Sequence, residues 1–170
     1  MEIRQLTSLD AKKYWDLRLE ALKQAPEAFL TSYEDAIKRE NPVTQVAGNF
    51  ADEGNYTFGA FEGDKLIGVV TLLQEKAEKI RHRANIYAMY VTPKKQGIGV
   101  GKALLTEAIN KAKSIEVIEK INLSVVATNE AAKKLYLSLD FKVYGLEEKA
   151  MKLNGVYLDD EHMVLHLKRT

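Results

Sequence analysis

A glycine-rich loop between an apolar strand and an apolar helix is the feature that most constrains the fold of this chain. Residues 91–105 read VTPKKQGIGVGKALL, and from Val100 onward apolar side chains recur at helical spacing. The first turn of a helix has backbone N–H groups without partners, and the helix dipole adds partial positive charge there. Lys94, Lys95 and Lys102 add local positive charge. Because glycines let an anion approach the backbone, the segment predicts a phosphate site made mostly of main chain.

Two common phosphate-binding motifs do not fit this loop. The dinucleotide fingerprint G-x-G-x-x-G would begin at Gly97 and Gly99, but it needs glycine where the chain has Lys102. The P-loop pattern G-x-x-x-x-G-K-[ST] needs glycine where the chain has Gln96, and serine or threonine where it has Ala103. The sequence therefore argues against a nicotinamide-dinucleotide site and against an NTPase site.

A third pattern, [QR]-x-x-G-x-[GA], fits the loop at residues 96–101, QGIGVG. This pattern is the acetyl-CoA signature of the GNAT superfamily of N-acetyltransferases, which the chain resembles. A second segment, residues 123–136, reads LSVVATNEAAKKLY and is followed by Phe141. It resembles the family pattern in which a strand is followed by N-x-x-A-x-x-L-Y and then by Gly-Phe. Asp140 stands where the family usually has glycine, but Asp tolerates left-handed backbone. Both motifs occur at the separation expected for the family, so a chance match is a poor explanation of the resemblance.

The periodicity of apolar residues predicts the order strand, helices, three strands, helix, strand, helix and two strands. Ser8 is expected to cap the first helix, and Pro42 to open a short one. Residues 86–91 are apolar at successive positions, which predicts a central strand covered on both faces. The closing strands are expected at residues 141–144 and 156–167. The expected fold is α/β (α+β), a GNAT-like mixed, mostly antiparallel central sheet of about six to seven strands flanked by helices on both faces.

Composition predicts one domain, residues 1–170, with a core of its own: 46% of the residues are hydrophobic and 29% are charged. Lys plus Arg number 25 and Asp plus Glu 24, a balance that argues against nucleic acid as a partner. The chain has no cysteine, which excludes disulfides, thiolate catalysis and zinc–thiolate sites. Its three histidines, His82, His162 and His166, are too scattered to predict a metal site.

The start of the chain lacks the apolar core of a signal peptide, and no apolar run approaches the roughly 18 residues that a membrane helix needs. We therefore expect a cytoplasmic protein without a membrane partner.

The resemblance implies which residues bind acetyl-CoA, the expected cosubstrate. Backbone at Met89, Tyr90 and Val91 is expected to pair with pantetheine and hold the thioester carbonyl. The expected pyrophosphate site is the main chain of the loop with its flanking lysine: Gln96, Gly97, Ile98, Gly99, Val100, Gly101 and Lys102. Asn129 is expected to cap a helix and to bond the CoA arm. Tyr136 is expected near the sulfur as the general acid, because a phenol with a pKa near 10 roughly matches a leaving thiol.

The general base and the acceptor stay open at this stage. Asn85 occupies the position where some relatives carry a glutamate, so Glu34, Tyr87, a water chain or an amine that arrives neutral are the alternatives. The expected acceptor is a primary amine, either a small amine such as a polyamine or a peptide amine. Acidic residues at 34–35 and 159–161 would attract such a cation. The alternative function is an acetyl-CoA-binding sensor without catalysis, which the presence of Tyr136 argues against. Family members often form homodimers, and the sequence leaves the oligomeric state open.

Overall fold

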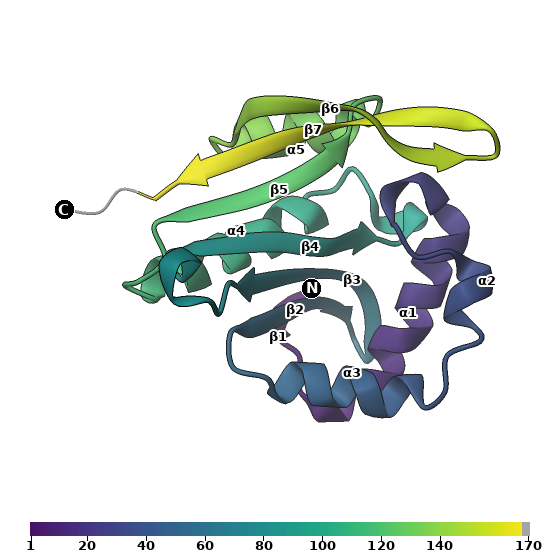
Figure 1. Cartoon of the computed structure of the whole chain (residues 1–170). Coiled ribbons are helices and arrows are strands. Elements are labelled where there is room, and N and C mark those ends of the chain that lie inside the picture. Colours follow the sequence, from purple (N-terminus) through teal and green to yellow (C-terminus); the bar gives the residue numbers. More distant parts are fainter. Residues whose placement is uncertain (168–170) are drawn as a thin grey trace.

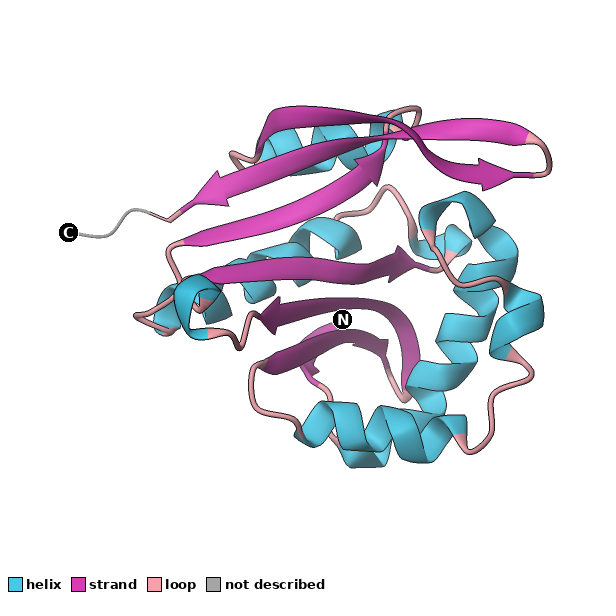
Figure 2. Cartoon of the chain, viewed as in Figure 1, coloured by secondary structure: helices cyan, strands magenta, loops and turns pink. Residues whose placement is uncertain are grey.

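The computed structural model describes residues 1–167, and within them one sheet has seven strands in the order β1-β2-β3-β4-β5-β7-β6 (Figures 1 and 2). The strands are β1 (Glu2–Gln5), β2 (Asn55–Glu62), β3 (Lys65–Gln74), β4 (Arg83–Val91), β5 (Lys120–Val126), β6 (Lys142–Leu153) and β7 (Val156–His166). Neighbouring strands of these described residues run antiparallel, except that β4 and β5 are parallel. The predicted mixed, mostly antiparallel sheet flanked by helices is confirmed.

Helices cover both faces of the sheet (Figure 2). On one face lie α1 (Ala11–Gln24), α2 (Tyr33–Ala36) and α3 (Pro42–Ala51), and on the other lie α4 (Val100–Ser114) and α5 (Glu130–Ser138). Short 3-10 turns occur at Ser8–Asp10, Pro26–Ala28, Glu78–Ile80 and Pro93–Lys95. The apolar stripe of α4, with Leu104 and Ala108 fully buried, packs on Ile67, Leu72 and Ile121 of the sheet. The apolar side of α1 packs in a separate cluster that includes Trp15, Phe61 and Tyr90.

The parallel pair β4–β5 is short. Its ladder in the described chain consists of Arg83↔Lys120, Ala84↔Ile121 and Asn85↔Asn122. Beyond these positions Ala88 adopts a left-handed conformation with φ 55°, and the register between β3 and β4 shifts between Val69 and Thr71. A bulge of this kind bends a strand and increases its twist. The second half of β4 therefore leaves β5, and the two ribbons diverge toward the right of Figure 1.

Three details differ from the sequence-based expectations. Thr7, not Ser8, is the N-cap of the 3-10 turn that leads into α1, because Thr7 and Asp10 form a capping box. The strand over residues 86–91 is not covered on both faces, since the divergence from β5 leaves Tyr87 52% exposed. The strand predicted at residues 141–144 continues to Leu153, so that β6 and β7 form a long hairpin at the top of Figure 1.

Candidate functional site

The glycine loop reaches α4 through two left-handed glycines. Gly97 has φ 79° and Gly99, the N-cap of α4, has φ 91°. L-residues rarely adopt such backbone, so glycine is required by conformation rather than by packing, and a Cβ at either position would meet open space. No side chain caps α4 in the described structure. The first N–H groups of α4 therefore have no side-chain acceptor, which leaves them to bind an anion.

The two ends of the loop are fixed by specific contacts. The side chain of Gln96 donates a hydrogen bond from Nε2 to the carbonyl oxygen of Val91, at 2.9 Å. Gly101 lies close to both neighbours of α4, since a Cβ there would be 3.0 Å from Cε of Met89 and 3.4 Å from Cδ2 of Leu135. Gln96 thus acts on the protein's own backbone, and Gly101 allows close packing of α4 against β4 and α5.

The three lysines of the loop are not equivalent. Nζ of Lys95 lies 2.8 Å from Oε2 of Glu62, so its charge is already paired. Lys94 and Lys102 are exposed, and neither forms an ion pair within residues 1–167. Lys102 in the first turn of α4 is the lysine best placed to add positive charge to the open N–H groups.

The end of β4 is held against α1 by Glu20, which the sequence did not single out. The hydroxyl groups of Tyr90 and Thr92 both donate to Oε2 of Glu20, at 2.7 and 2.8 Å. Burial, followed by the nearby carboxylate of Glu20, raises the pKa of Tyr90. Because the Tyr90 side chain faces α1, only its backbone lies at the edge that β4 presents toward β5.

Tyr136 and Asn129 both belong to α5. The Tyr136 ring is buried and contacts Phe141 edge-on, with 6.0 Å between ring centroids. Burial raises the pKa of Tyr136 to about 12, so its hydroxyl keeps its proton at neutral pH. Oδ1 of Asn129 accepts a hydrogen bond from the backbone N–H of Ala132, at 3.2 Å, which confirms its expected capping role. Asp140 follows α5 with φ 71°, the left-handed turn that the sequence predicted.

The sheet face opposite α4 and α5 carries a chain of polar side chains from three strands. Oγ of Ser124 on β5 lies 2.7 Å from Nδ1 of His162 on β7, and Nε2 of His162 lies 3.0 Å from Oε1 of Glu147 on β6. Ser124 is two residues beyond Asn122, the last β5 residue paired with β4. The chain therefore lies where the two strands separate. The sequence reasoning missed it, and its signal is the alternation of polar residues along β5 and β7.

The acidic residues expected to attract an amine have different roles. Glu34 and Asp35 are exposed on α2. Asp159 accepts a hydrogen bond from the backbone of Lys149, and Glu161 forms an ion pair with Lys133 at 3.2 Å. Burial, and next the charge of Glu147, raises the pKa of Asp160. Among residues 159–161, Asp160 is therefore the residue that adds negative charge beside Glu147.

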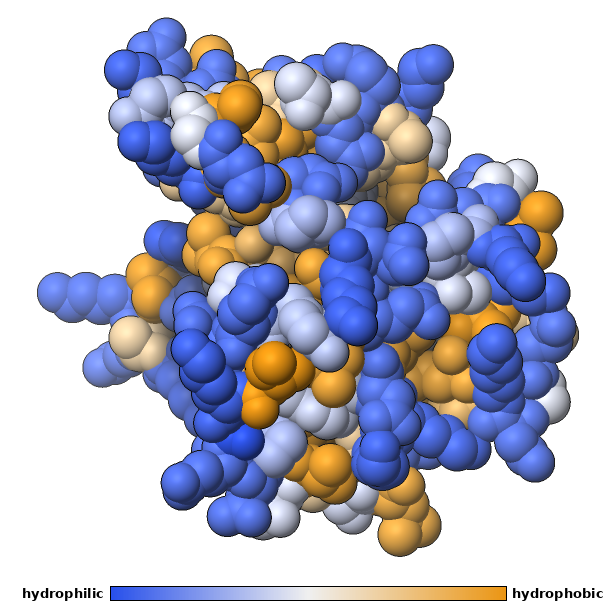
Figure 3. Space-filling model, turned by 90° about the vertical axis from the view of Figure 1, so that its right-hand side faces the viewer, coloured by the Kyte–Doolittle hydropathy of each residue, from blue (hydrophilic) through white to orange (hydrophobic). Residues whose placement is uncertain are grey.

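Figure 3 views the molecule from the right-hand side of Figure 1, and the surface is hollowed between the upper part, which contains the β6–β7 hairpin, and the larger lower part. Within residues 1–167, no group of three or more side chains has an arrangement that could hold a metal ion. None of the helices in this range has the length and apolar character required for a membrane span.

Comparison with known proteins identifies the family. Residues 14–141 match the acetyltransferase (GNAT) family, so the chain belongs to this family of acyltransferase enzymes. A GNAT-family acetyltransferase from Streptococcus pneumoniae has a similar structure, with a TM-score of 0.86, 21% identity and coverage of 98% of this chain and 99% of that chain. A putative acetyltransferase from Salmonella typhimurium, solved with its cofactor acetyl-CoA, gives a TM-score of 0.85 at 21% identity, covering 99% of this chain and 95% of that chain.

A ribosomal-protein-alanine N-acetyltransferase from Brucella melitensis is also similar, with a TM-score of 0.81, 22% identity and coverage of 98% of this chain and 100% of that chain. No curated protein matches the chain in sequence. At these identities the similar structures establish the fold, and the acceptor is a separate question.

Proposed function

We propose that this protein transfers the acetyl group of acetyl-CoA to a primary amine by direct attack. The observation that carries the proposal is the divergence of β4 from β5 after Asn85 and Asn122, between the glycine loop on one side and the Ser124–His162 pair on the other. Beyond the divergence Met89, Tyr90 and Val91 are no longer paired with β5, so the backbone groups on that edge are available to pantetheine, apart from the carbonyl of Val91, which accepts from Gln96. The acetyl-CoA in the similar Salmonella structure supports the choice of cosubstrate.

The main chain of the glycine loop is the proposed pyrophosphate site. Gly97, Ile98 and Gly99 are exposed, and the N–H groups of Val100, Gly101 and Lys102 lie in the first turn of α4. This arrangement offers a diphosphate backbone donors, the positive end of the helix dipole and the unpaired charge of Lys102. Because Oδ1 of Asn129 is engaged by Ala132, its amide N–H₂ is the part left to bond a carbonyl of the CoA arm.

In the proposed step the amine nitrogen attacks the thioester carbonyl carbon, and a C–N bond forms as the C–S bond breaks. Tyr136 donates a hydrogen bond to the leaving sulfur and delivers its proton to the thiolate. The pKa of Tyr136, raised to about 12, makes it a weaker acid than a free phenol. The same buried surroundings raise the pKa of a thiol placed beside it, so the two groups stay roughly matched.

The surplus proton of the amine needs an acceptor, and the polar chain on the opposite sheet face supplies one. A carboxylate only accepts hydrogen bonds, so Glu147 assigns the proton of neutral His162 to Nε2. Nδ1 then accepts from the hydroxyl of Ser124. The amine proton passes to Oγ of Ser124 as the Ser124 proton passes to Nδ1 of His162. Glu147 stabilises the resulting imidazolium.

The test is acetyl-CoA consumption, read as free thiol release, against amines of different classes: spermidine, amino acids, short peptides and an aminoglycoside. The chain has no cysteine, so the thiol signal comes from CoA alone. Turnover with one class supports the proposal and identifies the acceptor class. Tight acetyl-CoA binding without turnover of any amine would favour an acetyl-CoA sensor, and absence of CoA binding would contradict the proposal altogether.

A further inference from the structure

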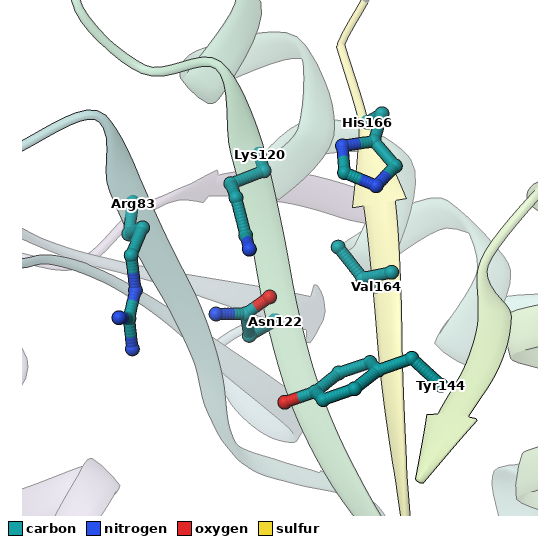
Figure 4. Close-up of a pocket in the computed structure, with 6 residues that line it drawn as sticks. All are labelled: Arg83, Lys120, Asn122, Tyr144, Val164 and His166. Atoms are coloured by element: carbon teal, nitrogen blue, oxygen red, sulfur yellow. The ribbon is translucent and has the colours of Figure 1, made fainter. Parts of the chain in front are cut away.

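A cavity of about 410 Å³ lies at the end of the polar sheet face where β4 and β5 are still paired (Figure 4). Its lining residues come from four strands: Arg83, Lys120, Asn122, Tyr144, Val164 and His166. Ile121 and Leu123 pack in the core with α4, so the intervening Asn122 points to the opposite face. Figure 4 shows the Tyr144 ring extending from β6 across β7 toward Asn122.

The cavity is cationic. Arg83 and Lys120 each carry a positive charge, His166 lies beside them, and no acidic residue of the described chain lines the cavity. Within residues 1–167, the side chains of these three residues form no ion pair and no hydrogen bond to another side chain. Unpaired positive charge in a concave site favours an anionic ligand.

Two buried polar atoms of this cavity have no partner in the described structure. Nε of Arg83 is a donor without an acceptor, and Oδ1 of Asn122 is an acceptor without a donor. Asn122 is only 8% exposed, so bulk water does not readily replace the missing donor. A buried polar group without a partner lowers stability, so a ligand that supplies the partner is favoured. A carboxylate satisfies the donor of Arg83, and an N–H group beside that carboxylate satisfies the oxygen of Asn122. A ligand end that resembles an amino acid or a peptide C-terminus offers both groups.

The sheet face connects this cavity to the proposed proton acceptor. Asn122 and Ser124 lie two residues apart on the same face of β5, a rise of about 7 Å. The far end of that path is negative, with Glu147 bonded to His162 and Asp160 on the neighbouring strand. The face is therefore positive at Arg83 and Lys120 and negative at Glu147 and Asp160. This polarity complements a molecule with a carboxylate at one end and an ammonium group at the other.

We propose that this cavity binds the carboxylate of the acceptor, and that the acceptor is an amine whose amino-acid-like or peptide-like carboxylate end lies about 7 Å from the reacting nitrogen. This inference rests on the proposed function and narrows its acceptor class. Lysine, reacting at its side-chain amine, and a dipeptide, reacting at its N-terminus, both have such a spacing.

The kinetic experiment compares each carboxylate with its matched carboxamide: diglycine with diglycine amide, and lysine with lysine amide. We expect a KM for the carboxylate at least about tenfold lower than for the amide, because Arg–carboxylate pairs are among the stronger polar contacts. In Arg83→Gln and in Lys120→Gln this ratio falls toward one. Arg81→Gln is the matched control, since Arg81 is exposed on the same segment but does not line the cavity, and it keeps the wild-type ratio.

A binding measurement separates this inference from the proposed function. Calorimetric titration of diglycine, its amide and free acetate into the CoA-loaded protein needs no turnover. If the wild-type protein binds diglycine more tightly than its amide, and Arg83→Gln removes this preference, the result supports carboxylate binding in the cavity even in the absence of acetyl transfer. Equal binding or equal KM of acid and amide overturns the inference while leaving acetyl transfer intact. Acetate whose binding is lost in Arg83→Gln but which does not compete with diglycine also overturns it, because the cavity then serves a separate anion.

Discussion

Nε2 of His162 lies 3.0 Å from Oε1 of Glu147 on the neighbouring strand. The carboxylate places the proton of the neutral imidazole on Nε2, so Nδ1 is the nitrogen that accepts from the hydroxyl of Ser124. Histidine is the residue that enzymes most often use as a proton acceptor near neutral pH. We therefore propose His162, held by Glu147, as the proton acceptor of the acetyl transfer.

Replacement of this histidine tests the proton acceptor. We expect His162→Gln to lower kcat by about 10- to 100-fold and to leave the affinity for acetyl-CoA unchanged. The loss should shrink with an amine of low pKa that is already neutral in the assay, because that amine needs no base. His82→Gln is the control, since His82 lies outside the polar chain. An equal loss with neutral and protonated amines would assign His162 a structural role.

Tyr136→Phe tests the proposed proton donor. We expect kcat to fall by about 10- to 100-fold while the dissociation constant of acetyl-CoA changes less than about twofold, since the ring and its packing on Phe141 are kept. Burial disfavours the phenolate and raises the pKa to about 12, so Tyr136 contributes no titration to the pH–rate profile below pH 10 or so. Tyr157→Phe, at an exposed position, is the control. A wild-type rate in Tyr136→Phe would remove this residue from the mechanism.

The order of elements and the glycine loop could be predicted from the sequence because both depend on local rules. Asn41-Pro42 opens α3, Asn129 caps α5, and the left-handed turn falls on Asp140, each as short-range propensities require. Loop glycines followed by an apolar helix stripe predict an anion site independently of the rest of the fold. Such features need no knowledge of which strands become neighbours.

The polar face could not be predicted because it is assembled by the order of the strands. Ser124 and His162 are 38 positions apart, and they meet only because β7 inserts between β5 and β6. Arg83 and Lys120 are brought opposite each other in the same way, as neighbours in the ladder of the single parallel strand pair of the described sheet. The exposure of Tyr87 likewise depends on the bulge at Ala88, which no periodicity of the sequence encodes.

The requirement for glycine at position 99, where the backbone is left-handed, can be tested by comparison with a glycine inside a helix. Gly99→Ala forces an L-residue into φ 91°, and we expect a loss of about 1–2 kcal/mol in stability or a matching loss in acetyl-CoA affinity. Gly48→Ala in α3 is the control: a Cβ there meets open space and its backbone is helical, so it should stabilise by roughly 0.5–1 kcal/mol. Measurement of Tm and of the CoA dissociation constant separates the two effects. A Gly99→Ala protein with wild-type Tm and affinity would show that the loop relaxes without cost.

The carboxylate of Asp10 gives a pH-dependent contribution to stability whose sign follows from its pKa. Arg4 donates two hydrogen bonds to it, at 2.8 and 2.9 Å, and the backbone N–H of Thr7 donates a third at 2.8 Å. The hydrogen bonds of Arg4 are the main cause that lowers the pKa of Asp10 to about 2. Because the folded-state pKa lies below the unfolded value of about 3.9, the stabilisation is fully present above about pH 4 and is lost as the pH falls toward 2.

We therefore expect Asp10→Asn to lower the free energy of unfolding at pH 7 by about 1–2 kcal/mol, a value reduced from the full linkage figure because Arg4 is partly exposed. The difference from wild type should narrow as the pH falls from about 4 to 2, since protonation removes the same charge from the native carboxylate. Urea unfolding of both proteins at a series of pH values measures it. Asp16→Asn, which breaks the exposed pair with Lys12, is the control and should change stability by less than about 0.5 kcal/mol. A constant difference between Asp10→Asn and wild type down to pH 2 would contradict the assignment, because the lost stability would then come from packing rather than from charge.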